Sequence, residues 1–316
     1  MDQSVRKSKK PSDKKIVQQK LWAFQPIHTF KSTVIILACA GTLFLIFGIV
    51  ICVEASKVVE VSKRYDNIDS CTPKLNEAQK AFTSSCSVDI TLDEDMEEPI
   101  YLYYEMHNFY QNHRMYVKSR NYDQLKGEYF STEDLDSCKP VKRIEDLEDY
   151  KPIDETKSRK DPAHPCGLVA ATVFNDTFKL QNTKIKETGI AWDSDKDYKF
   201  KNAKKSKQWT DVEDEHFIVW MRIAAMPKFR KLWGVIEEDL ESGTYTFEVQ
   251  SNYDVSQWDG QKHLVLTTVN SLGGKNYFLG IVFLCAAGVC YLAICVFGVM
   301  QFKRKSVGDE YRPKWN

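Results

Sequence analysis

The chain has 316 residues, with 44 Lys and Arg balancing 44 Asp and Glu, so its formal net charge is zero. Without a net positive charge it lacks the long-range field that attracts nucleic acid, and no nucleic-acid partner is predicted. Aromatic residues make up 12%, with only 14 glycines and 10 prolines, which excludes a largely disordered chain.

Two long apolar segments dominate the sequence. Residues 32–53 follow Lys31 and end before Glu54, and these 22 uncharged residues span about 33 Å as a helix, the thickness of a bilayer core. Residues 277–302 lie between Lys275 and Lys303 and add 26 uncharged residues. Both segments predict transmembrane helices. The first exceeds the roughly 7–15 apolar residues of a cleaved signal peptide, so it is interpreted as an uncleaved signal anchor.

The charges outside these spans predict the topology. The N-terminal tail, residues 1–31, has eight Lys or Arg against two Asp or Glu, and the C-terminal tail, residues 303–316, has five against two. The middle segment, residues 54–276, has 31 basic against 40 acidic residues. Because basic flanks stay in the cytosol, both tails are predicted to be cytosolic and the middle segment to be a lumenal or extracellular ectodomain.

The cysteines agree with this topology. Five of the nine lie in the spans, and the other four are Cys71, Cys86, Cys138 and Cys166 in the ectodomain. An even number in an oxidising compartment predicts two disulfides, but four cysteines allow three pairings and the sequence alone does not choose among them. The one N-glycosylation sequon, at Asn175, also lies in the ectodomain.

Within the ectodomain, aromatic and β-branched segments predict strands at 100–104, 217–223, 244–249 and 264–269, the last two forming a hairpin across Asp259-Gly260. Apolar residues at helical spacing predict a helix over 229–240. Residues 139–165 and 193–216 are expected to be surface loops. The predicted fold is an integral membrane protein with two transmembrane α-helices flanking a mainly antiparallel-β, disulfide-bonded ectodomain with short helices.

No catalytic pattern is present. The metalloprotease motif HExxH, the CxxC pair, the GxSxG elbow, the phosphate loop and the pump signature DKTG are all missing, so no cofactor, metal or catalytic residue is predicted. Asp193 and Asp195 could bind a cation, but a plain turn is the preferred reading. The spans contain no ionisable residue, so no ion pathway is indicated. An ectodomain without such chemistry favours a binding protein over an enzyme.

An ordered set of motifs then becomes specific. Its members are residues 18–21 with 25–27, 108–120 with 124–125, 165–168, 174–178, 189–192, 220–222, 227–232, 273–276 and 278–280. With these motifs the chain resembles the cell cycle control protein 50 family, the accessory (β) subunits of type IV P-type ATPases, which are phospholipid flippases. The resemblance covers residues 16–302. It departs from the family at Trp22-Ala23-Phe24, where the family usually has Pro-Ala-Trp, and it has only one cysteine pair in the first cluster, where some members carry two more cysteines.

The resemblance implies a β-rich ectodomain that caps the lumenal or extracellular loops of the pump. It implies disulfides Cys71–Cys86 and Cys138–Cys166 and a glycan on Asn175. It also implies that the pump needs this subunit to leave the endoplasmic reticulum, and that the pair works in secretory-pathway membranes such as the endoplasmic reticulum, the Golgi or endosome, and the plasma membrane. The partners would be the pump, as a heterodimer, and membrane lipid.

The candidate partner-binding residues are basic or lie at the entry to the second span: Arg114, Lys118, Arg120, Arg222, Arg230, Lys231, Gly273, Gly274, Lys275 and Asn276. Partner contact and internal ion pairing are equally expected for the first three, and internal pairing is slightly favoured for Arg222, Arg230 and Lys231. Glycines 41, 48, 280 and 288 are expected to let the spans pack closely against a partner. The alternative is that glycine is simply common in membrane helices. The competing hypotheses are a two-pass channel subunit and a stand-alone adhesion or receptor protein, and copurification of a large pump would separate them from the accessory subunit.

Overall fold

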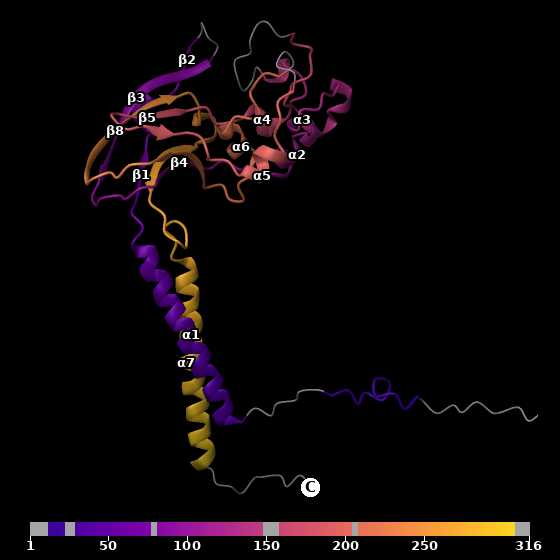
Figure 1. Cartoon of the computed structure of the whole chain (residues 1–316), viewed down its shortest axis with the longest axis vertical. Helices are drawn as coiled ribbons and strands as arrows, with labels where there is room; N and C mark the ends of the chain where they lie inside the picture. Colours follow the sequence, from indigo (N-terminus) through magenta and orange to yellow (C-terminus); the bar gives the residue numbers. More distant parts are fainter. Residues whose placement is uncertain (1–11, 23–28, 77–80, 148–157, 204–207, 307–316) are drawn as a thin grey trace, which may run out of the picture. The chain divides into compact units, whose positions relative to one another are not determined.

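The computed structural model of the chain describes residues 12–22, 29–76, 81–147, 158–203 and 208–306. Residues 25–27 of the predicted juxtamembrane motif lie outside these ranges, as do 1–11 and 307–316 of the tails. The chain divides into two compact units, one of residues 1–50 with 278–316 and one of residues 51–277 (Figure 1). Each unit is described by itself.

The first unit is a pair of long apolar helices, α1 (Phe30–Ser56) and α7 (Phe278–Ser306), each long and apolar enough to cross a membrane. The helices lie side by side (Figure 1). The hydroxyls of Thr42 and Tyr291 are 2.9 Å apart, and the rings of Phe44 and Phe283 stack at 5.8 Å. The helices therefore pack on each other through both polar and aromatic contacts.

Glycines make this close approach possible. A Cβ added at Gly41 would lie 3.1 Å from Cβ of Cys290, and one added at Gly48 would lie 2.8 Å from Leu284 and 3.1 Å from the carbonyl oxygen of Gly280. The expectation that Gly41 and Gly48 pack against a partner is corrected, because α7 of the same chain already fills the space beside them. Gly288 has no atom within 4 Å of an added Cβ.

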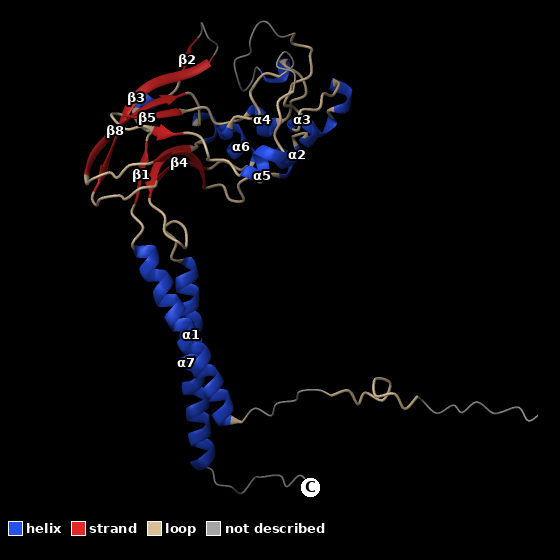
Figure 2. Ribbon diagram, in the orientation of Figure 1, coloured by secondary structure: helices blue, strands red, loops and turns tan. Residues whose placement is uncertain are grey.

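The second unit contains two antiparallel sheets, drawn in red in Figure 2. One has the order β1-β9-β4-β7-β6, formed by Glu60–Arg64, Gln261–Thr267, Ile100–His107, Phe229–Ile236 and Ile185–Lys186. The other has the order β2-β3-β8-β5, formed by Lys74–Asn76, Ala81–Leu92, Gly243–Ser251 and Thr177–Leu180. The expected strands at 100–104 and 244–249 are confirmed as parts of β4 and β8. The strand expected at 264–269 is confirmed over 264–267, the second half of β9, and residues 268–269 lie beyond it.

The core of this unit lies between the two sheets. The ring of Phe178 on β5 packs at 5.1 Å against Trp233 on β7 and at 5.8 Å against Tyr65 after β1. Alternate residues of both sheets join the same buried cluster, among them Val88, Ile90, Phe247, Val249, Leu102, Leu264 and Leu266. The sheets therefore form a sandwich whose inward-facing side chains are mostly apolar, with Lys231 and Lys262 among the buried exceptions.

Short helices and connections pack beside the sandwich (Figure 2). They are α2 (Arg114–Lys118), α3 (Tyr122–Leu125), α4 (Leu168–Ala171), α5 (Asp193–Tyr198) and α6 (Glu215–Met221), with 3-10 turns at Asp69–Cys71, Thr132–Asp134, Asp136–Cys138, Glu145–Leu147 and Ser256–Trp258. A second small core surrounds Cys138 and Cys166. The structure contains the disulfides Cys71–Cys86 and Cys138–Cys166, the pairs that the resemblance implies.

For two predicted elements, the structure has the other type of secondary structure. The strand predicted at 217–223 is helix α6, which begins at the cap Asp214, whose side chain accepts from the backbone N–H of His216. The helix predicted at 229–240 is strand β7. In the pairing of β4 with β7, Leu102 lies opposite Gly234 and Tyr103 lies opposite Leu232, so Trp233 forms a bulge. Before the bulge, residues 229, 231 and 233 face inward, and after it residues 234 and 236 face inward. This phase change gave a strand the apolar spacing of a helix.

Two smaller expectations also fail. The hairpin predicted across Asp259-Gly260 does not form, because β8 and β9 belong to different sheets. The loop expected at 193–216 contains α5 and the start of α6. Residues 139–165 are irregular where the structure describes them, with a 3-10 turn at Glu145–Leu147, and 148–157 lie outside the described residues.

Candidate functional site

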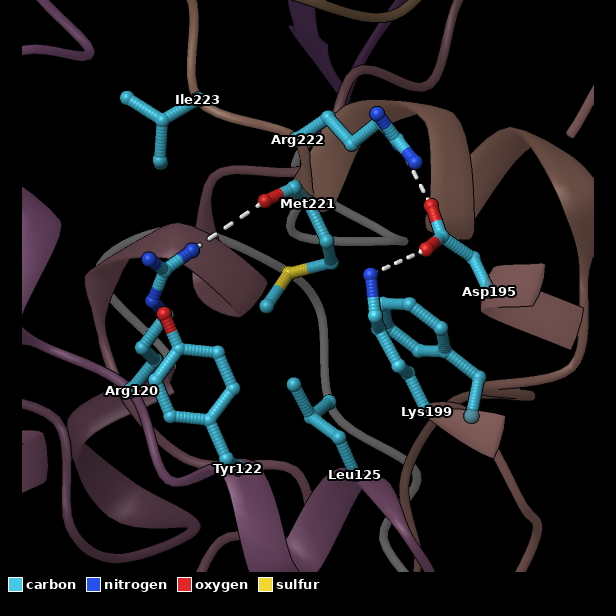
Figure 3. Close-up of a pocket in the computed structure, with 9 residues that line it drawn as sticks. Arg120, Tyr122, Leu125, Asp195, Lys199, Met221, Arg222 and Ile223 are labelled. Carbon is cyan, nitrogen blue, oxygen red and sulfur yellow. Dashed lines mark hydrogen bonds and ion pairs between the residues drawn. The ribbon is translucent and has the colours of Figure 1, made fainter. Parts of the chain in front are cut away.

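A pocket of about 340 Å³ opens among the short helices of the ectodomain (Figure 3). Its walls come from α3 and the segment just before it, from α5 and the two residues that follow it, and from the last residue of α6 with the two residues that follow it. The lining residues are Arg120, Tyr122, Leu125, Asp195, Lys199, Phe200, Met221, Arg222 and Ile223.

Asp195 organises one side of the pocket. Its side chain is 2% exposed and accepts from Arg222 Nε at 2.5 Å and from Lys199 Nζ at 2.6 Å (Figure 3). Burial by itself raises the pKa of Asp195, but the hydrogen bonds and charges of Arg222 and Lys199 outweigh it, so the pKa lies below its usual value. Asp195 therefore stays ionised and fixes two cations at the pocket edge.

Arg120 lies opposite, and its guanidinium is less fully engaged. One terminal nitrogen donates to the carbonyl of Met221 at 3.3 Å, and the guanidinium lies over the ring of Tyr122 at 4.6 Å. Its Nε is buried and has no hydrogen-bond partner among the described residues. A buried donor without a hydrogen-bond partner lowers the stability of the folded domain.

Aromatic side chains stand beside these cations. Trp192 is 67% exposed and lies under the guanidinium of Arg222 at 5.3 Å. Tyr122 and Tyr198 are exposed as well. The described lining contains no Ser, Cys or His, and its one carboxylate is already paired with two cations. Cations beside exposed aromatics are suited to docking an acidic segment.

The pocket gathers only two of the basic residues predicted from sequence, Arg120 and Arg222. The favoured internal pairing is found for Arg222, on Asp195, and for Arg230, which binds Glu60 through two nitrogens at 2.7 and 2.9 Å and Glu105 at 2.5 Å. Arg230 lies on the five-stranded sheet, outside the pocket lining.

Lys231 is also used internally. It is 7% exposed on β7, and its Nζ donates to the carbonyls of Val219, Trp220 and Arg222 at the end of α6. Burial, followed by the charge of Arg222, lowers the pKa of Lys231 to about 8. An ammonium at this position stabilises the helix C-terminus, where carbonyls lack partners within the helix.

The remaining predicted residues lie outside the pocket lining. Arg114 and Lys118 are exposed on α2 and form no ion pair with the described residues. Gly273 has φ +109°, which the turn with Asn270 requires, and Gly274, Lys275 and Asn276 follow it exposed. The sequence reasoning missed Tyr122, Lys199 and Trp192 as site residues. The i, i+4 spacing of Asp195 and Lys199 on a short helix was the available signal.

The sequon combines an exposed and a buried residue. Asn175 is exposed, while the carboxylate of the next residue, Asp176, is buried and binds the buried Lys262 at 2.6 Å. The Asn175 side chain is therefore accessible, and the backbone that carries it is held by the core.

Several known proteins are similar to this chain over most of its length. Residues 51–307 match the model of the LEM3 (ligand-effect modulator 3) family / CDC50 family. The chain is 36% identical over 336 residues to "ALA-interacting subunit 3" of Arabidopsis thaliana, covering 98% of this chain and 91% of that protein. It is 32% identical over 346 residues to "Cell cycle control protein 50A" of Mus musculus, covering 95% and 91%.

A yeast relative extends the comparison. "Phospholipid-transporting ATPase accessory subunit CRF1" of Saccharomyces cerevisiae is 29% identical over 364 residues, covering 97% of this chain and 89% of that protein. The match of the family model, these nearly full-length relatives, the two apolar helices and the disulfide-bonded β ectodomain agree: this chain belongs to the LEM3/CDC50 family.

Proposed function

We propose that this chain is the non-catalytic accessory subunit of a phospholipid-transporting type IV P-type ATPase. The observation that carries the proposal is its near full-length similarity to a protein named as an accessory subunit of such an ATPase. The two apolar helices supply a membrane anchor, and the described pocket offers cations and aromatic side chains that can bind a partner.

The proposed topology places both tails in the cytosol and the ectodomain in the lumen of the secretory pathway or outside the cell. The excess of basic residues in both tails supports it, as do the two ectodomain disulfides, which persist in an oxidising compartment. The exposed Asn175 then receives a glycan. Glycosidase treatment is expected to increase gel mobility, and Asn175→Gln is expected to abolish that shift.

The partner surface we propose consists of Arg114 and Lys118 on α2 together with the pocket cations Arg120 and Arg222. The first two are exposed and make no ion pair with the described residues, so a partner can use their charge. Arg222 is paired with Asp195, but its side chain is 49% exposed and can also meet a partner. Arg230 is bound to two carboxylates and Lys231 is buried, which removes both from this surface. An acidic extracytosolic loop of the pump has the complementary chemistry, because opposite charge speeds and orients docking.

Binding acts on the pump through its conformational cycle. A subunit that binds one state more tightly shifts the equilibrium only by the difference in affinity. We therefore expect association to vary along the cycle and to be strongest in a phosphorylated state, as the family resemblance implies. The subunit also covers pump surface that would otherwise be exposed, which supports a role in exit from the endoplasmic reticulum.

Copurification in mild detergent tests the proposal. The tagged chain is expected to recover a large ATPase, and deleting the chain is expected to retain that pump in the endoplasmic reticulum and abolish its lipid-stimulated ATP hydrolysis. If every type IV pump of the cell still traffics and flips lipid without the chain, the proposal is wrong.

The double substitution Arg114→Glu and Lys118→Glu tests the surface. It is expected to reduce pump recovery by at least tenfold without lowering the unfolding temperature of the free chain. Lys179→Glu reverses an exposed charge on β5, a segment far from α2 along the chain, and serves as the control. It is expected to leave recovery of the pump unchanged. Equal recovery for all variants would place the contact elsewhere.

A further inference from the structure

Three potential metal ligands meet on the five-stranded sheet, on the side away from the sandwich core. Glu105 and His107 are two residues apart on β4, so their side chains point to the same face. His263 on the neighbouring strand β9 is paired directly with Glu105. One ligand atom from each of the three residues lies within 4.8 Å of the others. The backbone pairing of two strands therefore fixes the spacing of the set.

We propose that Glu105, His107 and His263 bind a divalent transition metal ion of the zinc class. Two imidazoles and one carboxylate form a donor set that Zn²⁺ uses in proteins, with a fourth position left for water. Metal–ligand distances of about 2.0–2.2 Å correspond to donors roughly 3.5 Å apart in a tetrahedron. His107 Nε2 and Glu105 Oε1, which are 2.6 Å apart, would separate to admit the ion, and donors as far as 4.8 Å apart would move closer. The inference does not depend on the partner proposed above.

The hydrogen bond within the cluster marks the place of the ion. Nε2 of His107 lies 2.6 Å from Oε1 of Glu105, so one proton is shared there. The ring of His263 stacks on that of His107 with centroids 4.4 Å apart, and its buried Nδ1 has no hydrogen-bond partner among the described residues. A metal ion would replace the shared proton, which passes to solvent, and would use imidazole lone pairs that the sheet leaves available.

Three basic residues, Arg230, Lys228 and Arg64, lie near the cluster, and their positive charge would oppose the binding of a cation unless it is neutralised or moved away. Arg230 binds the other carboxylate oxygen of Glu105, Oε2, at 2.5 Å, and it is also held by two bonds to Glu60, so two carboxylates share its charge. Such an outer hydrogen bond orients a ligating carboxylate and leaves Oε1 free to bind metal. Lys228 contacts Oε1 at 3.3 Å, but its side chain is 63% exposed and can turn into water. Arg64, paired with His263 across the strands, is neutralised by Asp66 at 2.7 Å.

Zinc binding by the full-length chain tests the site. The chain is purified in mild detergent with a tag that lacks histidine, its membrane cysteines are alkylated, and it is stripped with chelator and dialysed against buffered Zn²⁺. Elemental analysis is expected to find about one Zn²⁺ per chain. His263→Gln and His107→Gln are each expected to weaken this binding by at least tenfold, since ligand loss removes a third of the donors.

His216→Gln is the matched control. His216 also contacts a carboxylate, Glu187 at 3.1 Å, but it is not part of the three-residue cluster. This variant is expected to bind Zn²⁺ as the unaltered chain does. Equal unfolding temperatures of all variants in chelator establish that the fold is kept, and His107→Gln, at a partly exposed position, serves if His263→Gln fails to fold. No saturable binding by the unaltered chain, or unchanged binding by both cluster variants, would overturn the proposal.

Discussion

Lys262 and Asp176 form an ion pair of 2.6 Å inside the ectodomain, with side chains 1% and 0% exposed. The ammonium also donates to Ser251 Oγ at 2.8 Å and to the Tyr253 carbonyl at 2.7 Å. The carboxylate also accepts from the Tyr65 hydroxyl at 2.7 Å and from two backbone N–H groups at 2.6 Å. Every partner lies in a different segment from the sequon, so the pair ties the backbone of the glycan site to β8 and β9.

Lys262→Met is expected to destabilise the ectodomain by about 3–5 kcal/mol, because it leaves Asp176 buried without its counter-ion. Urea unfolding followed by tryptophan fluorescence measures the change. Asp176→Asn keeps the sequence Asn-x-Thr and is expected to be destabilising too, while the double variant loses less than the sum of the two. Strict additivity would show that the two side chains do not depend on each other.

Removing either disulfide is expected to cost about 3–4 kcal/mol in the chain-entropy model, since the bridged residues are 15 and 28 positions apart. The paired variants Cys71→Ser with Cys86→Ser, and Cys138→Ser with Cys166→Ser, avoid a free thiol. Unfolding temperature and unreduced peptide mapping check the expectation. A crossed pairing in the peptide map would contradict it.

The packing of α1 on α7 predicts a new crosslink. Gly41→Cys places a thiol next to the native Cys290, since an added Cβ at Gly41 lies 3.1 Å from that residue. Mild oxidation is expected to join the helices. A protease site inserted at 181–184 separates the halves after cleavage, because both native disulfides lie N-terminal to it. The halves then stay linked on an unreduced gel only when the crosslink has formed.

Two controls make this crosslink specific. Gly41→Cys combined with Cys290→Ser is expected to give separate halves. Gly288→Cys lies where no atom is within 4 Å of an added Cβ, and it is expected not to crosslink within the chain. Crosslinking of Gly288→Cys in place of Gly41→Cys would mean that the helices meet through other faces.

Asp195 predicts a pH dependence of stability. Arg222 and Lys199 hold its folded pKa below the usual value of 3.8, despite burial. Its contribution is therefore complete above the unfolded pKa and is lost as the pH falls through the folded pKa. Asp195→Asn is expected to cost about 1–2 kcal/mol at pH 7, because both cations remain partly hydrated. The difference in unfolding temperature between this variant and the unaltered chain is expected to shrink below about pH 4. A constant difference down to pH 3 would contradict the pairing.

The sequence by itself determined the membrane-spanning helices, the division of the cysteines between spans and ectodomain, the β-rich character and the family. These properties depend on composition and on local periodicity, and a run of more than twenty uncharged residues has few alternatives to a membrane helix. Strand β4 was predictable because Ile100 and its neighbours are β-branched and aromatic.

Tertiary structure decided the rest. The bulge at Trp233 changed which residues of β7 face inward, and the buried Lys231 hid the alternation because a charge is not expected at a core position. Helix α6 resembles a strand in sequence because Phe217, Ile218, Trp220 and Met221, four of its seven residues, are buried apolar side chains close together along the chain. The pocket of Arg120 and Asp195 and the cluster of Glu105 and His263 join segments 75 and 158 positions apart along the chain. Local patterns do not specify which distant segments meet, since packing of the whole core selects those contacts.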